Sequence, residues 1–122
     1  MMINVKDQVY AALCEVADNV SDVYPQTWAS LPAIQYTEED NSVYTRTDAD
    51  EQYANLRYRI DIWDTKSTSL TALAVDEAVS ALGLIRTACQ DAADPSGMRH
   101  KVMRYEGIID VNTEMVYWNG SR

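Results

Sequence analysis

The chain has 122 residues, 47% of them hydrophobic, with four glycines and three prolines, which is typical of one folded globular domain and not of a linker. Its formal charge is −9, a sign that disfavours binding to nucleic acid phosphates or to an anionic membrane. Eight tyrosines and three tryptophans, with no phenylalanine, suit surfaces that are half buried or that become buried on assembly.

The first ten residues, MMINVKDQVY, contain neither a basic n-region nor an apolar h-region, so no secretion signal is expected. No apolar run approaches the roughly 20 residues that span a bilayer. Cys14 and Cys89 lie far apart and outside any C-x-x-C spacing, which predicts free thiols. We therefore expect a soluble protein made in the cytoplasm, without membrane contact.

Residues 3–22 are predicted to form a helix that ends at Tyr24-Pro25, because the residue before a proline avoids the α region. Five apolar residues recur at spacings of three and four and share one stripe: Val5, Val9, Leu13, Val16 and Val20. Tyr10 and Cys14 lie off the stripe, one turn apart. They are predicted either to be exposed on the helix flank or to face a neighbouring subunit.

Residues 23–36 are predicted to be a connection that becomes a strand over about 33–38, with Trp28 closing the end of the core. An acidic segment follows over 37–52, which indicates a solvated loop or a long hairpin tip. Its acids are Glu38, Glu39, Asp40, Asp48, Asp50 and Glu51, with Arg46 as the single base. The turn glycine and distal glutamate of a calcium-binding EF-hand loop are missing, so no metal site is predicted.

The segment from Ala54 to Asp64 alternates with a period of two and predicts the central strand. One set of side chains is apolar and is expected to be buried: Leu56, Tyr58, Ile60 and Ile62. The other set is expected to stay in solvent: Arg57, Arg59, Asp61 and Trp63. On that wet face, Arg59 and Asp61 are predicted to form a surface ion pair.

A second helix is predicted over residues 69–82 and ends at Gly83. Its buried face is predicted to carry Leu70, Ala74, Ala78 and Ala81, widened by Val75, Val79 and Leu82, while Leu73 is an exposed apolar candidate. Residues 84–92 predict a strand with Cys89 in the core, and residues 93–97 predict a turn.

A further alternating strand is predicted over residues 99–111, and an apolar tail follows it. In that strand Met103, Tyr105, Ile109 and Val111 alternate with His100, Arg104, Glu106 and Asp110. The tail with Tyr117 and Trp118 is predicted either to dock as an edge strand or to contact a partner.

The element order α-β-β-α-β-β predicts a single α+β domain over residues 1–122. We expect a mostly antiparallel sheet of four to five strands with two helices packed on it. The single histidine, His100, has no metal-binding partners at a known spacing, and no nucleophile elbow, P-loop or dinucleotide motif occurs. The sequence therefore predicts an interaction module, with no enzymatic activity, cofactor or metal.

The chain resembles the tail terminator (tail completion) proteins of long-tailed bacteriophages, a family that includes the lambda tail terminator. The resemblance rests on order, spacing and length over about residues 3–118. It includes the first helix leading to Val23-Tyr24-Pro25, YRIDIWD before a helix that ends in LGL, and HKVMRYEGIID before the VYW segment.

The resemblance implies a hexameric ring in the virion, at the head–tail interface, that caps the tail tube and offers a docking surface for the head connector. DNA would pass through the channel without specific binding, and six copies would carry about −54, six times −9, which repels phosphates within a Debye length. The acidic segment would face the lumen or a ring surface. Interface candidates are Tyr10, Arg57, Arg59, Trp63, Leu73, Tyr117 and Trp118. The alternatives are a head-closure or neck protein of the same virion and a small regulatory ligand-binding domain.

Overall fold

The computed structural model of the chain describes residues 5–47, 50–110, 113 and 116–118. Its elements in chain order are α1 (Lys6–Cys14), β1 (Asn19–Ser21), β2 (Ala33–Thr47), β3 (Asp50–Asp64), α2 (Ser69–Ser80), β4 (Ile85–Ala92), β5 (Arg99–Asp110) and β6 (Val116–Trp118). The strands form one sheet in the order β1-β2-β3-β5-β4, and β6 also pairs with β5. Every pairing is antiparallel except that of β1 with β2.

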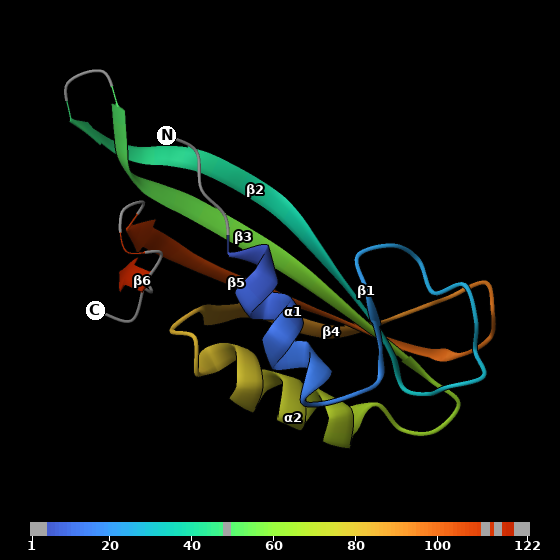
Figure 1. The fold of residues 1–122 in the computed structure, drawn as a ribbon. Coiled ribbons are helices and arrows are strands. Elements are labelled where there is room, and N and C mark those ends of the chain that lie inside the picture. The colour runs from blue at the N-terminus through green and yellow to red at the C-terminus, as the bar shows by residue number, and fades with distance from the viewer. Residues whose placement is uncertain (1–4, 48–49, 111–112, 114–115, 119–122) are drawn as a thin grey trace.

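Both helices lie on the same face of the sheet, which confirms the predicted α+β class (Figure 1). The apolar side chains of β3 point into this layer, and four of them are fully buried: Leu56, Tyr58, Ile60 and Ile62. Val9 and Leu13 of α1 and Val75 and Val79 of α2 pack against them. No helix in the described part of the chain is long and apolar enough to cross a bilayer.

The first helix is shorter than predicted, because it ends at Cys14 and the chain turns into β1. Val16 and Val20 still pack on the core, but from a turn and a strand. The Asn19 side-chain amide donates hydrogen bonds to the carbonyls of Thr27 and Ser30, which hold this segment beside the following loop. The predicted apolar stripe therefore identified the valines that pack on the core, but it did not identify the residue at which the helix ends.

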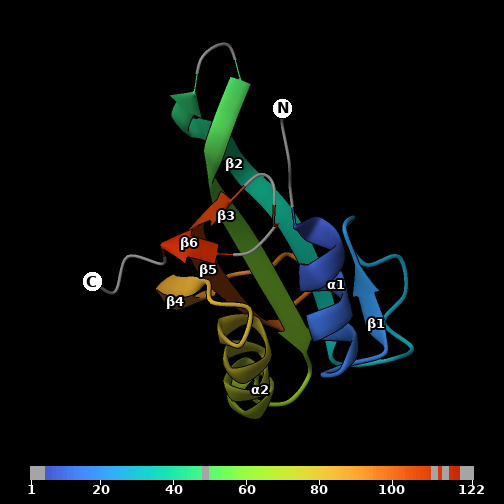
Figure 2. The same cartoon turned by 60° about the vertical axis from the view of Figure 1, so that its left-hand side comes forward.

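The acidic segment is not a loop, because residues 37–47 continue β2 and residues 50–52 begin β3. Its pairing runs to Thr47 opposite Asp50, and irregularities in register occur between Glu38 and Asp40 and again beyond Val43. The hairpin alternative is thus confirmed. Figures 1 and 2 show this hairpin projecting past the helices. Asp48 lies outside the described residues.

α2 spans Ser69–Ser80 but is rotated relative to the prediction, since Ala72, Val75 and Val79 form its buried face. The bulkier valines remove more apolar surface from water than the alanine stripe would. Leu70 is therefore 80% exposed, and Ala74 and Ala81 are exposed too. Leu73 is exposed as predicted. Gly83 adopts a φ of 95° just beyond the helix, as expected for a glycine that ends it.

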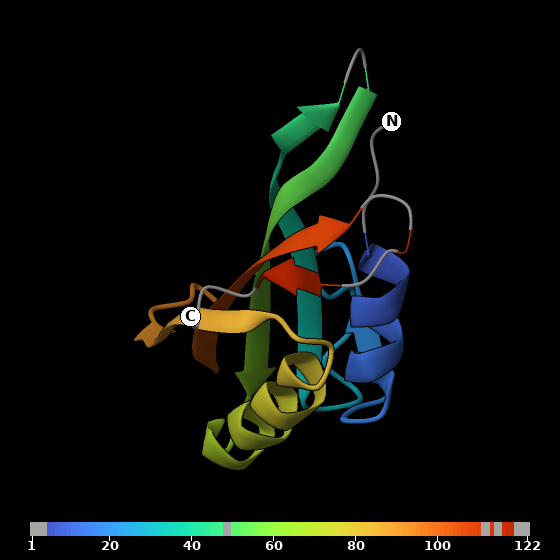
Figure 3. The same cartoon turned by 90° about the vertical axis from the view of Figure 1, so that its left-hand side faces the viewer.

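The last strands follow the prediction with one correction. Met103, Tyr105 and Ile109 of β5 are buried, whereas Cys89 of β4 is exposed and not in the core. β4 is the last strand in the sheet order, and a register shift between Arg86 and Ala88 breaks its alternation. β6 docks on β5 at Ile108 and Ile109, as the edge-strand alternative predicts (Figure 3). Val111 lies outside the described residues.

Candidate functional site

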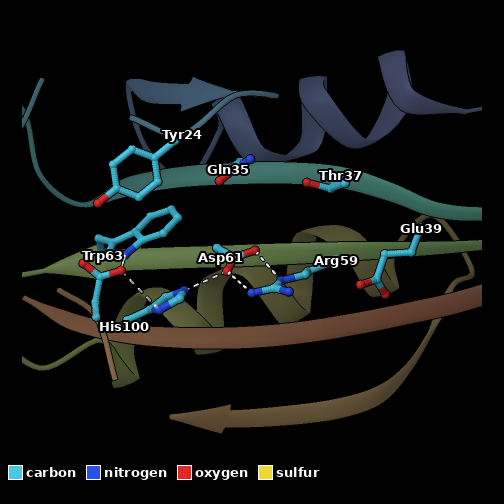
Figure 4. Close-up of a pocket in the computed structure, with 9 residues that line it drawn as sticks. Tyr24, Gln35, Thr37, Glu39, Arg59, Asp61, Trp63 and His100 are labelled. Atoms are coloured by element: carbon cyan, nitrogen blue, oxygen red, sulfur yellow. Dashed lines mark hydrogen bonds and ion pairs between the residues drawn. The ribbon is translucent and has the colours of Figure 1, made fainter. Parts of the chain in front are cut away.

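The sheet face opposite the helices carries an open pocket of about 390 Å³ (Figure 4). Three strands and two loops supply its lining: Gln35, Thr37 and Glu39 from β2, Arg59, Asp61 and Trp63 from β3, His100 from β5, and Tyr24 and Asp94 from loops. Because alternate residues of a strand share one face, this lining is the polar half of the pattern whose apolar half forms the core. The pocket is therefore built directly on the central strand.

Asp61 is the centre of the polar network, and it is buried rather than on the surface as predicted, with a side chain only 5% exposed. Arg59 donates to both carboxylate oxygens, with Nε–Oδ1 and Nη2–Oδ2 distances of 2.9 Å. His100 Nε2 lies 2.7 Å from Asp61 Oδ2. The predicted ion pair exists, but His100 makes it part of a three-residue network. The pKa of Arg59 is raised, chiefly by its hydrogen bond to Asp61.

Trp63 was predicted to be in solvent but is 2% exposed, because the loop between β1 and β2 covers it. The rings of Tyr24 and Trp28 lie 5.3 Å and 6.0 Å from the Trp63 ring. Trp28 thus packs on the outer face of the sheet instead of closing the end of the core. On its other side Trp63 stacks on His100, with centroids 4.5 Å apart and planes 12° apart.

The second ring nitrogen of His100 is buried without a hydrogen-bond partner. It lies 3.8 Å from Asp94 Oδ1, an oxygen that accepts the Trp63 indole N–H at 3.0 Å. His100 is therefore held from three sides, by Asp61, Asp94 and the Trp63 ring.

A second charged group lies beside this network, around Glu39. Its carboxylate accepts from Arg104 Nε at 3.0 Å and forms an ion pair with Arg57 Nε at 3.3 Å. Arg59 and Arg104 are direct cross-strand neighbours, a like-charge placement that Glu39 and Asp61 offset. Glu39 is thus neutralised on the sheet and does not belong to a free acidic loop.

Glu38 points to the opposite face, so the predicted acidic cluster is divided between the two sides of the sheet. It accepts a hydrogen bond from the Tyr58 hydroxyl at 2.9 Å, and that hydroxyl accepts the Val5 N–H at 3.0 Å. Burial, followed by the effect of Glu38, raises the pKa of Tyr58 well above its ordinary value. Asp40 accepts a hydrogen bond from the Ser42 hydroxyl.

The predicted interface residues fall on two faces. Arg57, Arg59 and Trp63 lie on the outer face of the sheet. Tyr10 and Leu73 project from the helical layer, where the Tyr10 ring contacts the Tyr36 ring at 5.7 Å and remains 44% exposed. The prediction for Tyr117 and Trp118 concerns side chains beyond those that the structure describes.

The carboxylates of the pocket are already engaged within the chain: Glu39 by Arg57 and Arg104, Asp61 by Arg59 and His100, and Asp94 by Trp63 and Ser96. Partners within the chain therefore fix the positions of these three carboxylates. Within the described residues, no group of three or more His, Cys, Asp or Glu side chains could hold a metal ion. Comparison with models of protein families and with curated protein sequences finds no match to the chain.

The contribution of Asp94 to the stability of the fold is predicted to depend on pH. Its pKa is lowered, chiefly by hydrogen bonds from Ser96 and further by Trp63 and His100. Because the folded-state pKa is lower than the unfolded value of about 3.9, the ionised carboxylate stabilises the fold above that pH. This stabilisation is lost as the pH falls through the folded-state pKa. Asp94→Asn should therefore be less stable than wild type near pH 6, and the difference should shrink as the pH falls below the unfolded pKa. Urea unfolding across this range measures it, and a constant difference would contradict the assignment.

Proposed function

We propose that the chain is a structural virion protein, a tail terminator that forms a ring on the end of the tail tube and offers a surface to the head connector. The observation that carries this proposal is the β2–β3 hairpin. It continues past the helix-covered body, and within the residues that the structure describes β5 pairs with β3 as far as Tyr53. A projecting hairpin on a small body gives neighbouring subunits and the tube an element to contact.

The outer face of the sheet supports the same proposal. Its arginines hold Glu39 and Asp61 in place through Nε and Nη2 donors, so the face is ordered before any partner binds. Head-to-tail contacts between such faces and projecting arms close into rings when the rotation allows. We propose a hexamer whose net negative charge would let DNA pass through the channel.

The pocket itself favours a second candidate function, a small regulatory domain that binds a polar aromatic ligand between Tyr24 and Arg59. Its carboxylates are occupied by internal partners, so a ligand would have to compete with them. A monomer stabilised by a small ligand, without any ring, would favour this candidate. Rings that bind connectors but ignore tubes would favour the head-closure alternative.

Arg57 provides the cleanest mutational test of assembly. Its side chain is 43% exposed and its partner Glu39 keeps Arg104, so Arg57→Glu should still fold. Some stability should be lost, because the cross-strand neighbours of residue 57 are Asp40 and Glu106. Reversing Arg59 would also disrupt the Asp61 network, which makes that variant less specific. If Arg57 lies in a ring contact, its reversal should weaken assembly by roughly tenfold or more, about 1.4 kcal/mol.

The measurement is native mass spectrometry with negative-stain imaging of the same sample, on the protein alone and mixed with tail tubes. Lys66→Glu changes the net charge equally at an exposed site and serves as the control. We expect the wild type and Lys66→Glu to form rings and Arg57→Glu to lose them. A monomer or dimer that never binds tubes would overturn the terminator proposal.

A further inference from the structure

A groove of about 350 Å³ lies between α1 and α2 on the helical side of the molecule. Its walls are mostly small and apolar, with Ala11 and Ala12 on α1 and Ala78, Ala81 and Leu82 on or just after α2. Small side chains on both helices leave a hollow where larger residues would have closed the contact. Figure 1 shows the two helices side by side in one layer.

The apolar surface of the groove continues along α2 onto solvent. Leu70, Ala74 and Ala78 recur at a spacing of four and so share one side of the helix. Leu70 is 80% exposed and Ala74 is exposed, while the opposite side of α2 buries Val75 and Val79. α2 therefore has two apolar faces, and only one of them contacts the sheet.

The charges around this surface all have one sign. On α1, Asp7 and Glu15 lie one turn before and one turn after Ala11, and on α2 Glu77 lies one turn before Ala81. All three are exposed, and none has a basic partner within the described residues. α2 carries no lysine or arginine, and Lys6, the single base of α1, pairs with Asp22.

Two of these acids also lie where the helix dipole disfavours them. Glu15 is the C-cap of α1 and Glu77 is in the last turn of α2, at ends that attract positive charge. A cation supplied from outside would relieve this conflict at both positions. The groove thus combines an apolar floor with an acidic rim.

We propose that the groove between α1 and α2 binds a basic amphipathic helix of a partner protein. Its apolar side chains would fill the hollow between Ala11 and Ala78, while lysines or arginines would reach Asp7, Glu15 and Glu77. The inference is independent of ring formation, because the groove lies within one copy of the chain.

The probe for this proposal is a fluorescein-labelled, amidated peptide of leucine and lysine, about 18 residues or five helical turns long, with leucines at helical spacing. Fluorescence anisotropy should show saturable binding to the wild type that weakens with salt. Ala11→Trp and Ala81→Trp fill the groove without changing charge, and each should weaken binding at least tenfold. Ala93→Trp, at an exposed turn, is the matched control and should bind like the wild type.

Three results would overturn the proposal. Equal binding of a scrambled peptide of the same composition, or binding that both groove-filling variants retain, would show attraction by net charge alone. If the wild type formed concentration-dependent dimers and Ala81→Trp abolished them, a second copy of the chain would occupy the groove. Circular dichroism of each variant confirms that a loss of binding is not a loss of folding.

Discussion

Ile60→Asp is expected to unfold the protein. Ile60 is fully buried at the middle of β3, the central strand, where its cross-strand neighbours are Tyr36 on β2 and Met103 on β5. The buried cluster around Ile60 consists of aliphatic residues, Met103 and tyrosines, so the new carboxylate would lack an ionic partner there. The cost is several kcal/mol, comparable to the whole stability of a small domain at about 5–15 kcal/mol.

Thermal melting followed by circular dichroism tests this expectation, with Gln90→Asp as the control. Gln90 is exposed on β4, so its replacement adds the same charge without burial and should melt within a few degrees of the wild type. An Ile60→Asp protein that remained soluble and melted cooperatively would mean that β3 presents its other face to the helices.

Asp61→Ala is expected to have the second largest effect. The substitution leaves the His100 Nε2–H buried without its acceptor and releases the Arg59 guanidinium, which is partly exposed and can return to water. We expect a loss of about 2–4 kcal/mol, since breaking a buried ionic network from one side leaves its other members unpaired. That loss corresponds to a fall in Tm of roughly 10–15 °C for a chain of this size.

Asp61→Asn keeps an acceptor for His100 and should lose less stability than Asp61→Ala. Guanidinium unfolding of both variants, combined with His100→Gln in a double-mutant cycle, isolates the coupling between the two side chains. If the effects of the Asp61 and His100 substitutions on the free energy of unfolding were additive, the Asp61–His100 hydrogen bond would not contribute to stability. Coupling of about 1 kcal/mol or more is the expected result.

The sequence predicted the strand faces of this fold better than the helix faces. Strict alternation over Leu56–Ile62 leaves one register that buries the apolar set, and that register is present. In α2 two apolar stripes compete, and the stripe with Val75 and Val79 is buried while the stripe with Leu70 lies outside. Periodicity therefore identified the helix without identifying its buried side.

The site was only partly predictable for a different reason. Alternation placed Asp61, Trp63 and His100 on one face, and the strand pairing sets Trp63 directly opposite His100. Their burial depends on Tyr24 and Trp28, which arrive from a loop whose path no local pattern fixes. The acidic hairpin was ambiguous because its charges suit a loop, while its pairing depends on a partner strand.

The length of β3 has a mechanical consequence. At about 3.3 Å per residue its 15 residues span roughly 50 Å, more than the roughly 35 Å diameter of a compact globule of this chain length. One continuous strand therefore joins the hairpin to the Asp61–His100 network and the aromatic rings at the opposite end. A load carried along β3 from the hairpin would therefore reach the point where Asp61 binds His100 and so ties β3 to β5.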